Sequence, residues 1–190
     1  KIIDKAKEIV QLHKDGKASY SQYPRTIDDT KRQYIAKGTY VKLSSSKWGY
    51  AGSTYNGIST SVNNGKGVIG YDCSSFVSCC YLYAGLKSMY NGNCSAGSIM
   101  NEIINNGGKM WLANKEGIKN ALPGDCIMFC SNNHNPTQKE MDNKKFLNTH
   151  HIGIYLGDDQ MAHASKWTTV PNAIKISKLS YHRITIFFNL

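Results

Sequence analysis

The sequence predicts an α+β domain, with helices in its N-terminal part and an antiparallel set of strands after them. Apolar residues recur at helical spacing in 1–14, 73–85 and 96–106, and each of these runs ends at or near a glycine. After a short helical turn near 115–121, the pattern changes to short β-like runs. Five strands are expected, at residues 125–131, 150–157, 160–165, 173–176 and 182–189.

The segment between the first two helices is expected to be ordered but poor in regular structure. Residues 17–70 are rich in Ser, Gly and Asn, yet they contain enough aromatic side chains to pack. One or two short helices are expected there, one of them near 27–36. We expect a single domain over residues 1–190, in which 1–45 form an N-terminal helical and loop extension and 46–190 form the core.

The net charge of +10, from 23 basic and 13 acidic residues, favours polyanionic partners, of which nucleic acid and an anionic cell wall are two. No basic run is interleaved with aromatic residues, and no zinc finger or recognition helix is evident, so nucleic acid is disfavoured. No stretch approaches the roughly 20 apolar residues that a membrane helix needs. The charged amphipathic start is not typical of a secretion signal, and Lys1 in place of Met indicates an excised domain or a processed product.

The six cysteines could form three disulfides, but their placement predicts otherwise. Cys79 and Cys80 are adjacent in one apolar stretch, and Cys126 and Cys130 lie in another, as expected of small core residues. The same interpretation covers all but one of the six. Cys73 differs, because an apolar helix follows it at once.

Cys73 is expected in the first turn of the second helix. The partial positive charge at a helix N-terminus stabilises a thiolate and lowers the pKa of the thiol. Because the thiolate is the attacking species, this position suits a nucleophile better than the middle of a helix would. A buried cysteine near a helix cap is the alternative, which this segment alone does not exclude.

A cysteine nucleophile needs a base, and the base needs an orienting group. His151 lies in a predicted strand, where it shares a face with Gly153 and Tyr155, opposite the apolar face. We expect the catalytic helix to approach this face. A turn at 157–159 leads into the next strand, so that His163 is expected beside His151, holding its imidazole in one tautomer. Without a CxxC pair, an HExxH motif or a Gly-x-Ser-x-Gly elbow, a zinc site and a serine nucleophile are both disfavoured.

Four segments, in this order, resemble the NlpC family of papain-like cell-wall cysteine peptidases. Residues 72–77 (DCSSFV) are similar to the nucleophile motif of the family, in which a glycine is usual at Ser75. Residues 122–125 (LPGD) are similar to its Pro-Gly-Asp segment. Residues 151–157 resemble the strand that carries the base, and 161–164 resemble the strand after it. The resemblance implies a papain-like α+β fold, with the nucleophile at a helix N-terminus packed on an antiparallel sheet.

The resemblance also implies an activity, namely hydrolysis of an amide bond in the peptidoglycan stem peptide, without a metal or cofactor. The usual target is the bond between the γ-carboxyl of D-glutamate and the diamino acid. Cys73 would attack, His151 would take and return the proton, and His163 would orient His151. The backbone N–H of Cys73 would hold part of the oxyanion.

Substrate contacts follow from the same resemblance. The residues that flank the nucleophile, Asp72 and Ser74, would contact the stem peptide. An upstream tyrosine also lines the site of the family, and Tyr50 is our choice among the tyrosines of this chain. The polar excursion at 132–147 would be a wall of the site, with a plain surface loop as the alternative.

Other functions stay open at this point. A CHAP-like N-acetylmuramoyl-L-alanine amidase or a cross-bridge endopeptidase would use the same Cys and His. An inactive cell-wall-binding module is a third alternative, disfavoured because competent residues occupy all three catalytic positions. The expected partners are stem peptides and anionic wall polymers. The expected location is the extracellular cell wall, either as a monomer or domain of a larger secreted protein, or as a lysin of a phage or mobile element.

Overall fold

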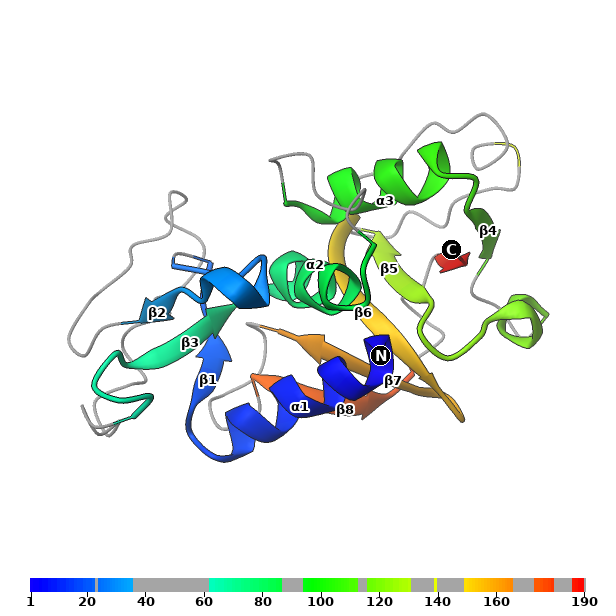
Figure 1. Ribbon diagram of the computed structural model, residues 1–190. Coiled ribbons are helices and arrows are strands. Elements are labelled where there is room, and N and C mark those ends of the chain that lie inside the picture. The colour runs from blue at the N-terminus through cyan, green and yellow to red at the C-terminus, as the bar shows by residue number, and fades with distance from the viewer. Residues whose placement is uncertain are drawn as a thin grey trace.

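The computed structural model describes residues 1–22, 24–35, 62–86, 94–112, 116–130, 139, 149–165, 173–179 and 186–189. For Leu112 and for 186–189 it describes the backbone only. The order of the elements along the chain can be followed in Figure 1. They are α1 (Ile2–Lys14), β1 (Ala18–Tyr20), η1 (Asp29–Lys31), β2 (Tyr34–Ile35), β3 (Val68–Tyr71), α2 (Cys73–Tyr83), α3 (Ala96–Asn105), β4 (Lys109–Leu112), η3 (Gly117–Asn120), β5 (Cys126–Cys130), β6 (Thr149–Gly157), β7 (Gln160–Ala164), β8 (Ile174–Lys178) and β9 (Ile186–Asn189).

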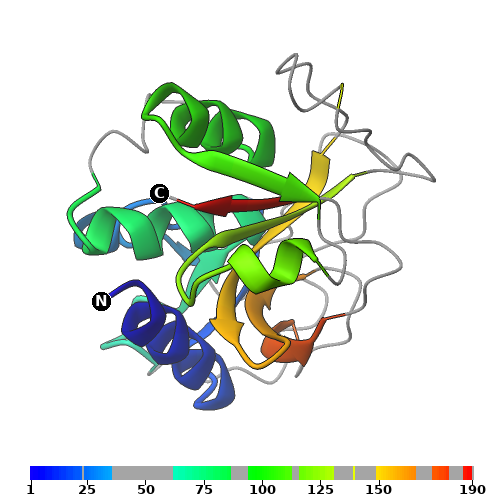
Figure 2. The ribbon, with the colours of Figure 1, turned by 90° about the vertical axis from the view of Figure 1, so that its right-hand side faces the viewer.

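A six-stranded antiparallel sheet, in the order β4-β9-β5-β6-β7-β8, forms the C-terminal part. The three α-helices lie along one side of it (Figure 2). α3 contacts β6 and β9, α2 contacts β6 and β7, and α1 contacts β7 and β8. Apolar side chains of the helices and of one sheet face form the main core. This arrangement confirms the α+β class. The opposite sheet face carries a smaller cluster of Ile127, Phe129, Tyr155, Met161 and Leu179.

Helix α1 joins the N-terminal segment to the main core. Its residues Ala6, Ile9 and Val10 are buried in the same cluster as α2 and the sheet. Lys5 is also buried, and its ammonium group pairs with the carboxylates of Glu8 and Asp29, at 2.9 and 2.8 Å, as a buried charge requires. The residues before position 36 therefore help to build the core. The division of the domain at 45/46 stays a prediction.

A small three-stranded sheet, in the order β1-β3-β2, precedes α2. β1 pairs with β3 in parallel, and β2 pairs with β3 in antiparallel orientation. None of these strands was expected from the sequence, and neither was β4, because strands of two to four residues are too short to show alternation. The prediction of a short helix near 27–36 is wrong. That stretch contains a single 3₁₀ turn, η1, and then strand β2.

Helix α2 lies between the small sheet and the six-stranded sheet (Figure 1). All residues from Ser74 to Tyr81 are buried, so the helix has no exposed face in this stretch. Asp72 and Ser75 start it by a reciprocal capping box. Gly85, at φ +97°, follows its end. The helix expected at 73–85 is confirmed, and its start at Cys73 is fixed by the side chain of the preceding residue.

The β6–β7 hairpin turns at Asp158 and Asp159, whose φ angles of +50° and +55° suit the two central positions of a tight hairpin turn. Gly153 then allows β7 to approach β6 closely. A Cβ atom at this glycine would lie 3.0 Å from the carbonyl oxygen of Ala162 and 3.2 Å from Cβ of His163. The strand therefore needs a glycine there to keep the two strands at this distance.

Candidate active site

Cys73 is the first residue of α2, and its side chain is half-buried. The carboxylate of Asp72 accepts a hydrogen bond of 2.7 Å from the Ser75 N–H, and the Asp72 N–H donates to the Ser75 hydroxyl at 2.9 Å. The backbone N–H groups of Ile152 and Ser74 favour the thiolate form of Cys73. Because Ile152 directly follows His151 on β6, the thiol lies against the strand that carries the proposed base.

The pKa of the Cys73 thiol differs from the prediction. Burial, together with the negative charge of Asp72, raises the pKa of this thiol to about 12, although the N–H groups of Ile152 and Ser74 favour the thiolate. The lowered pKa expected from the helix start is therefore wrong for the ligand-free protein, because desolvation outweighs the backbone donors.

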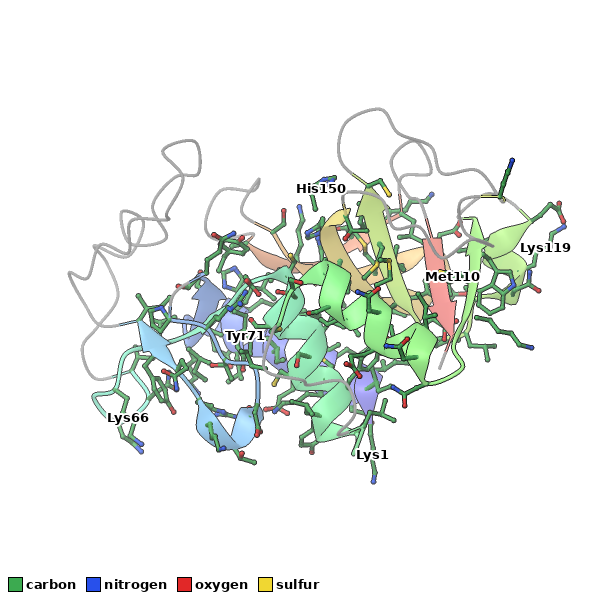
Figure 3. All side chains as sticks on the ribbon, turned by 90° about the horizontal axis from the view of Figure 1, so that it is seen from above. Lys1, Lys66, Tyr71, Met110, Lys119 and His150 are labelled. Atoms are coloured by element: carbon green, nitrogen blue, oxygen red, sulfur yellow. The ribbon has the colours of Figure 1, made fainter. Side chains whose placement is uncertain are left out.

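His151 and His163 lie side by side on the β6–β7 hairpin. Nε2 of His151 is 2.7 Å from Nδ1 of His163, and the two rings meet edge to face with their centroids 5.0 Å apart. The expected contact between the two histidines is confirmed. Their position can be followed in Figure 3 from His150, which precedes His151, while Tyr71 marks the end of β3 just before Asp72.

His163 is buried and is held from its other side by β8. Nε2 of His163 is 2.7 Å from the hydroxyl oxygen of Ser177. Burial and the positive charge of Lys175 lower the pKa of His163 to about 4. The imidazole of His163 is therefore neutral at neutral pH and carries a single N–H.

The two histidines lie on the sheet face that the helices do not cover. The ring of His151 lies beside that of Phe129, its partner on β5, with centroids 5.3 Å apart, and Phe129 belongs to the smaller cluster. Ile152 and Ile154 face the main core and α2 instead. The expectation that the catalytic helix approaches the His151 face is wrong. The start of α2 meets β6 at the backbone N–H of Ile152.

Asp72 and Ser74, the two expected substrate contacts, belong to one buried hydrogen-bonded network. The Ser74 hydroxyl donates to the Asp72 carboxylate at 3.0 Å. The guanidinium of Arg25 pairs with the other carboxylate oxygen and lies 3.4 Å from the Ser74 hydroxyl. The Asp72 side chain is 6% exposed. Substrate contact by Asp72 and Ser74 stays a prediction, and Arg25 is a member of the network that the sequence did not indicate.

Arg25 reaches this network because β3 contains a glycine. A Cβ atom at Gly70 would overlap the carbonyl oxygen of Pro24. The backbone around Arg25 is tied to the same strand, since the Thr26 N–H donates to the Gly70 carbonyl at 2.7 Å. Because segment 24–26 packs closely against β3, the guanidinium of Arg25 lies next to Asp72. No local sequence pattern predicts this contact.

Tyr20 is a second residue that sequence reasoning missed. It ends β1, in register with Tyr71, and its hydroxyl accepts a hydrogen bond of 3.2 Å from the Gln22 amide. Burial raises the pKa of Tyr20, and the negative charges of Cys73 and Asp72 raise it further, which places this tyrosine near the start of α2. The parallel pairing of β1 with β3 brings it there. Tyr50, the tyrosine chosen from the sequence, lies outside the described residues.

The Leu-Pro-Gly-Asp segment forms the turn that leads into β5. Gly124 has φ +106°, and the Asp125 carboxylate accepts a hydrogen bond of 2.8 Å from the Leu122 N–H. The Gly124 N–H donates to the carbonyl of Tyr155 on β6, and its own carbonyl accepts from the Tyr81 hydroxyl at 3.1 Å. This turn therefore connects α2 to β6 through hydrogen bonds, and its role is structural.

Cys79, Cys80, Cys94, Cys126 and Cys130 are buried and form no disulfide among the described residues, as expected of core cysteines. Within the described ranges no group of three His, Cys, Asp or Glu side chains could hold a metal ion. No helix in those ranges is long and apolar enough to cross a membrane. The excursion at 132–147 lies outside the described residues, apart from Lys139.

The NlpC/P60 family model matches residues 45–185. Among solved structures, the NlpC/p60 domain of the peptidoglycan hydrolase SagA is similar at 18% identity and a TM-score of 0.36, over 64% of this chain and 78% of that one. RipD from Mycobacterium tuberculosis, a non-catalytic NlpC/p60 domain protein, is similar at 15% identity and a TM-score of 0.48, over 99% and 95%. NlpC2 from Trichomonas vaginalis follows at 17% identity and 0.44, over 96% and 45%. No curated protein matches the chain.

The fold and the matched residues define a papain-like domain with a cysteine at a helix start and a histidine pair on the adjoining sheet. The chain belongs to the NlpC/P60 family. Membership in this family supports a role on peptidoglycan, as a hydrolase or as a binding domain.

Proposed function

We propose that this domain is a cysteine endopeptidase that hydrolyses the γ-D-glutamyl–diamino acid bond of peptidoglycan stem peptides. The observation that carries the proposal is that the start of α2 meets β6 next to His151. The N–H of Ile152 favours the thiolate of Cys73, and Nε2 of the preceding His151 lies 2.7 Å from Nδ1 of His163. A thiol, a base and a group that orients the base are the parts that acyl transfer by a cysteine requires.

In the proposed reaction, His151 takes the thiol proton as the Cys73 sulfur attacks the amide carbonyl carbon. The backbone N–H of Cys73, at the helix start, donates to the developing oxyanion. His151 then returns the proton to the amino group of the diamino acid, which leaves as the C–N bond breaks. Water, deprotonated by His151, hydrolyses the thioester and frees the γ-carboxyl and the thiol.

The raised pKa of Cys73 makes the base essential in this scheme. With a thiol pKa of about 12, very little thiolate exists at neutral pH unless a base accepts the proton. In the proposed arrangement, Nδ1 of neutral His163 accepts the Nε2–H of His151, which leaves Nδ1 of His151 as the basic nitrogen. We assign the role of orienting residue to His163 on this ground.

The substrate contacts in the proposal surround the start of α2. The Asp72 carboxylate already binds Ser74, Ser75 and Arg25, so its part is to hold this rim in shape beside a bound stem peptide. Tyr20 is the aromatic residue that we place at the site, because it adjoins Cys73. Tyr50 stays a candidate for the same task.

The net charge of +10 supports a working place at the cell wall, where anionic polymers would concentrate the protein. We propose that the domain acts outside the cell, as part of a secreted or a phage- or element-borne wall hydrolase. A binding assay of the protein on purified walls, at low and high salt, tests this part, since electrostatic retention has to weaken as salt rises.

The test of the proposed reaction is a digest of purified muropeptides analysed by mass. An endopeptidase creates new amino termini on the diamino acid, whereas an amidase releases intact stem peptides from muramic acid. We expect the first product set from the wild-type protein and none from His151→Ala. Stem release without a new amino terminus would replace the proposal by the amidase alternative. Wall binding without any cleavage would replace it by the binding module.

A further inference from the structure

The hydrogen-bonded chain that starts at His151 does not end at His163. It continues to β8, where the Ser177 hydroxyl lies 2.7 Å from Nε2 of His163. In the β7–β8 pairing, Ser177 is opposite Met161 and Lys175 is opposite His163. Ser177 and His163 therefore project from the same face of neighbouring strands, on a diagonal. The three neighbouring strands β6, β7 and β8 each contribute one side chain to this hydrogen-bonded series: His151, His163 and Ser177.

The direction of these hydrogen bonds decides whether His151 is a base. A neutral imidazole has one N–H and one acceptor nitrogen. If Nε2–H of His163 donates to Ser177, Nδ1 of His163 accepts from Nε2–H of His151, and Nδ1 of His151 is left with a lone pair. If Ser177 donates instead, every proton in the chain is reversed. His151 is then protonated at Nδ1 and cannot take a proton there.

We propose that Ser177 is a positioning residue of the reaction, which fixes the Nε2–H tautomer of His163 by accepting its hydrogen bond and thereby fixes His151 as a base at Nδ1. The inference rests on the proposed function. No proton travels beyond His151 in this scheme: the thiol proton moves to Nδ1 of His151, and the resulting imidazolium donates its Nε2–H to His163.

Among the described residues around His163, Ser177 is the one placed to fix its tautomer. Two titratable groups face His163 from the neighbouring strands, His151 on β6 and Lys175 on β8. The ammonium group of Lys175 favours the uncharged imidazole but, as a charge, it does not select which nitrogen carries the proton. Ser177 contacts Nε2 of His163 directly, and when its hydroxyl accepts there, the proton of His163 is on Nε2.

The kinetic test compares Ser177→Ala with Ser177→Thr, which keeps the hydroxyl, in a muropeptide digest. We expect Ser177→Ala to lower kcat about 10-fold with little change in KM, the lower end of the loss found when a hydrogen-bond partner that orients a metal-bound imidazole is removed. Ser177→Thr should restore most of this loss. In a His163→Asn background the same Ser177→Ala change should alter kcat less than about twofold, because the residue it acts through is gone. An equal loss in both backgrounds would overturn the proposal.

A spectroscopic test separates this inference from the proposed function, since it needs no activity. Long-range proton–nitrogen NMR spectra of the histidine rings report which nitrogen is protonated. We expect Nε2–H for both His151 and His163 in the wild-type protein at neutral pH, and a mixture of tautomers in Ser177→Ala. Nδ1–H at His163 in the wild-type protein would overturn the role of Ser177, even if the protein cleaves muropeptides. The expected tautomers in a protein without activity would instead leave Ser177 in place and refute the peptidase.

Discussion

The carboxylate of Asp72 is paired with the guanidinium of Arg25, a residue 47 positions earlier in the chain. The same carboxylate caps α2 by accepting the Ser75 N–H, so one side chain links the helix start to segment 24–26. Both partners are largely buried, with 6% and 20% of their side chains exposed. This pair supplies a positive charge close to a carboxylate that otherwise opposes thiolate formation at Cys73.

Replacing Arg25 with Gln should destabilise the protein. The change leaves the buried carboxylate of Asp72 without its cation, and breaking such a pair from one side costs about 3 kcal/mol. Urea unfolding measures this loss. The double variant Arg25→Gln with Asp72→Asn should recover part of it, because no buried charge is then left unpaired. If the double variant is as unstable as the sum of the two single ones, the pair is not what stabilises this region.

Replacing Asp72 with Asn should lower the pKa of the Cys73 thiol from about 12. Asn still caps a helix, so α2 keeps its start, while the negative charge beside the sulfur disappears. The pH dependence of alkylation by iodoacetamide, followed at Cys73 by mass, measures the shift. Arg32→Gln is the matched control, since it removes a charge that pairs with Asp29 and Glu8 instead of one beside the sulfur. A thiol pKa that stays the same or rises in Asp72→Asn would refute the electrostatic account.

The parts of this fold that follow from periodicity could be predicted, and those that follow from tertiary contacts could not. The helix at Cys73 and the hairpin that carries His151 and His163 are local patterns, and both are present as expected. The raised pKa of Cys73 depends on how deeply the helix start is buried, which no window of sequence reports. Arg25 depends on the close passage of its segment over Gly70, and it has no local signature.

His163 makes stability depend on pH. Its pKa of about 4 in the folded protein lies below the ordinary value of 6.5, so the unfolded chain binds more protons between these two values. Stability from this residue is complete above about pH 6.5 and is lost as pH falls toward 4. The loss should reach about 2 kcal/mol at pH 5. It is measured as the difference between the wild-type protein and His163→Asn in urea unfolding at pH 7 and pH 5.

The comparison with His163→Asn is needed because Asp125 acts in the opposite direction. Burial raises the pKa of Asp125 to about 6, so ionising it costs stability as pH rises. This contribution is common to both proteins and cancels in the difference. An identical pH dependence of the wild-type protein and the variant would show that His163 is not held neutral by the fold.

Gly153→Ala should impair the histidine pair more than it impairs the fold. The new Cβ would meet the Ala162 carbonyl at 3.0 Å and Cβ of His163 at 3.2 Å, so β7 has to move away from β6. We expect muropeptide cleavage to fall at least about 10-fold, as for other small misplacements of catalytic groups. Gly97→Ala in α3 is the control, because among the described residues its Cβ would meet the Thr149 hydroxyl alone, at an ordinary contact distance of 3.8 Å. Full activity of Gly153→Ala would contradict the claim that cleavage depends on the close approach of β7 to β6.

The central claim is that Cys73 is the nucleophile, and the measurement that tests it most directly is muropeptide cleavage by Cys73→Ala beside Cys79→Ala. Both changes remove one thiol from the same helix, and Cys79 is buried in the core. The account predicts no cleavage by Cys73→Ala, with binding to walls retained, and clear cleavage by Cys79→Ala. Cleavage by Cys73→Ala at the wild-type rate would contradict it.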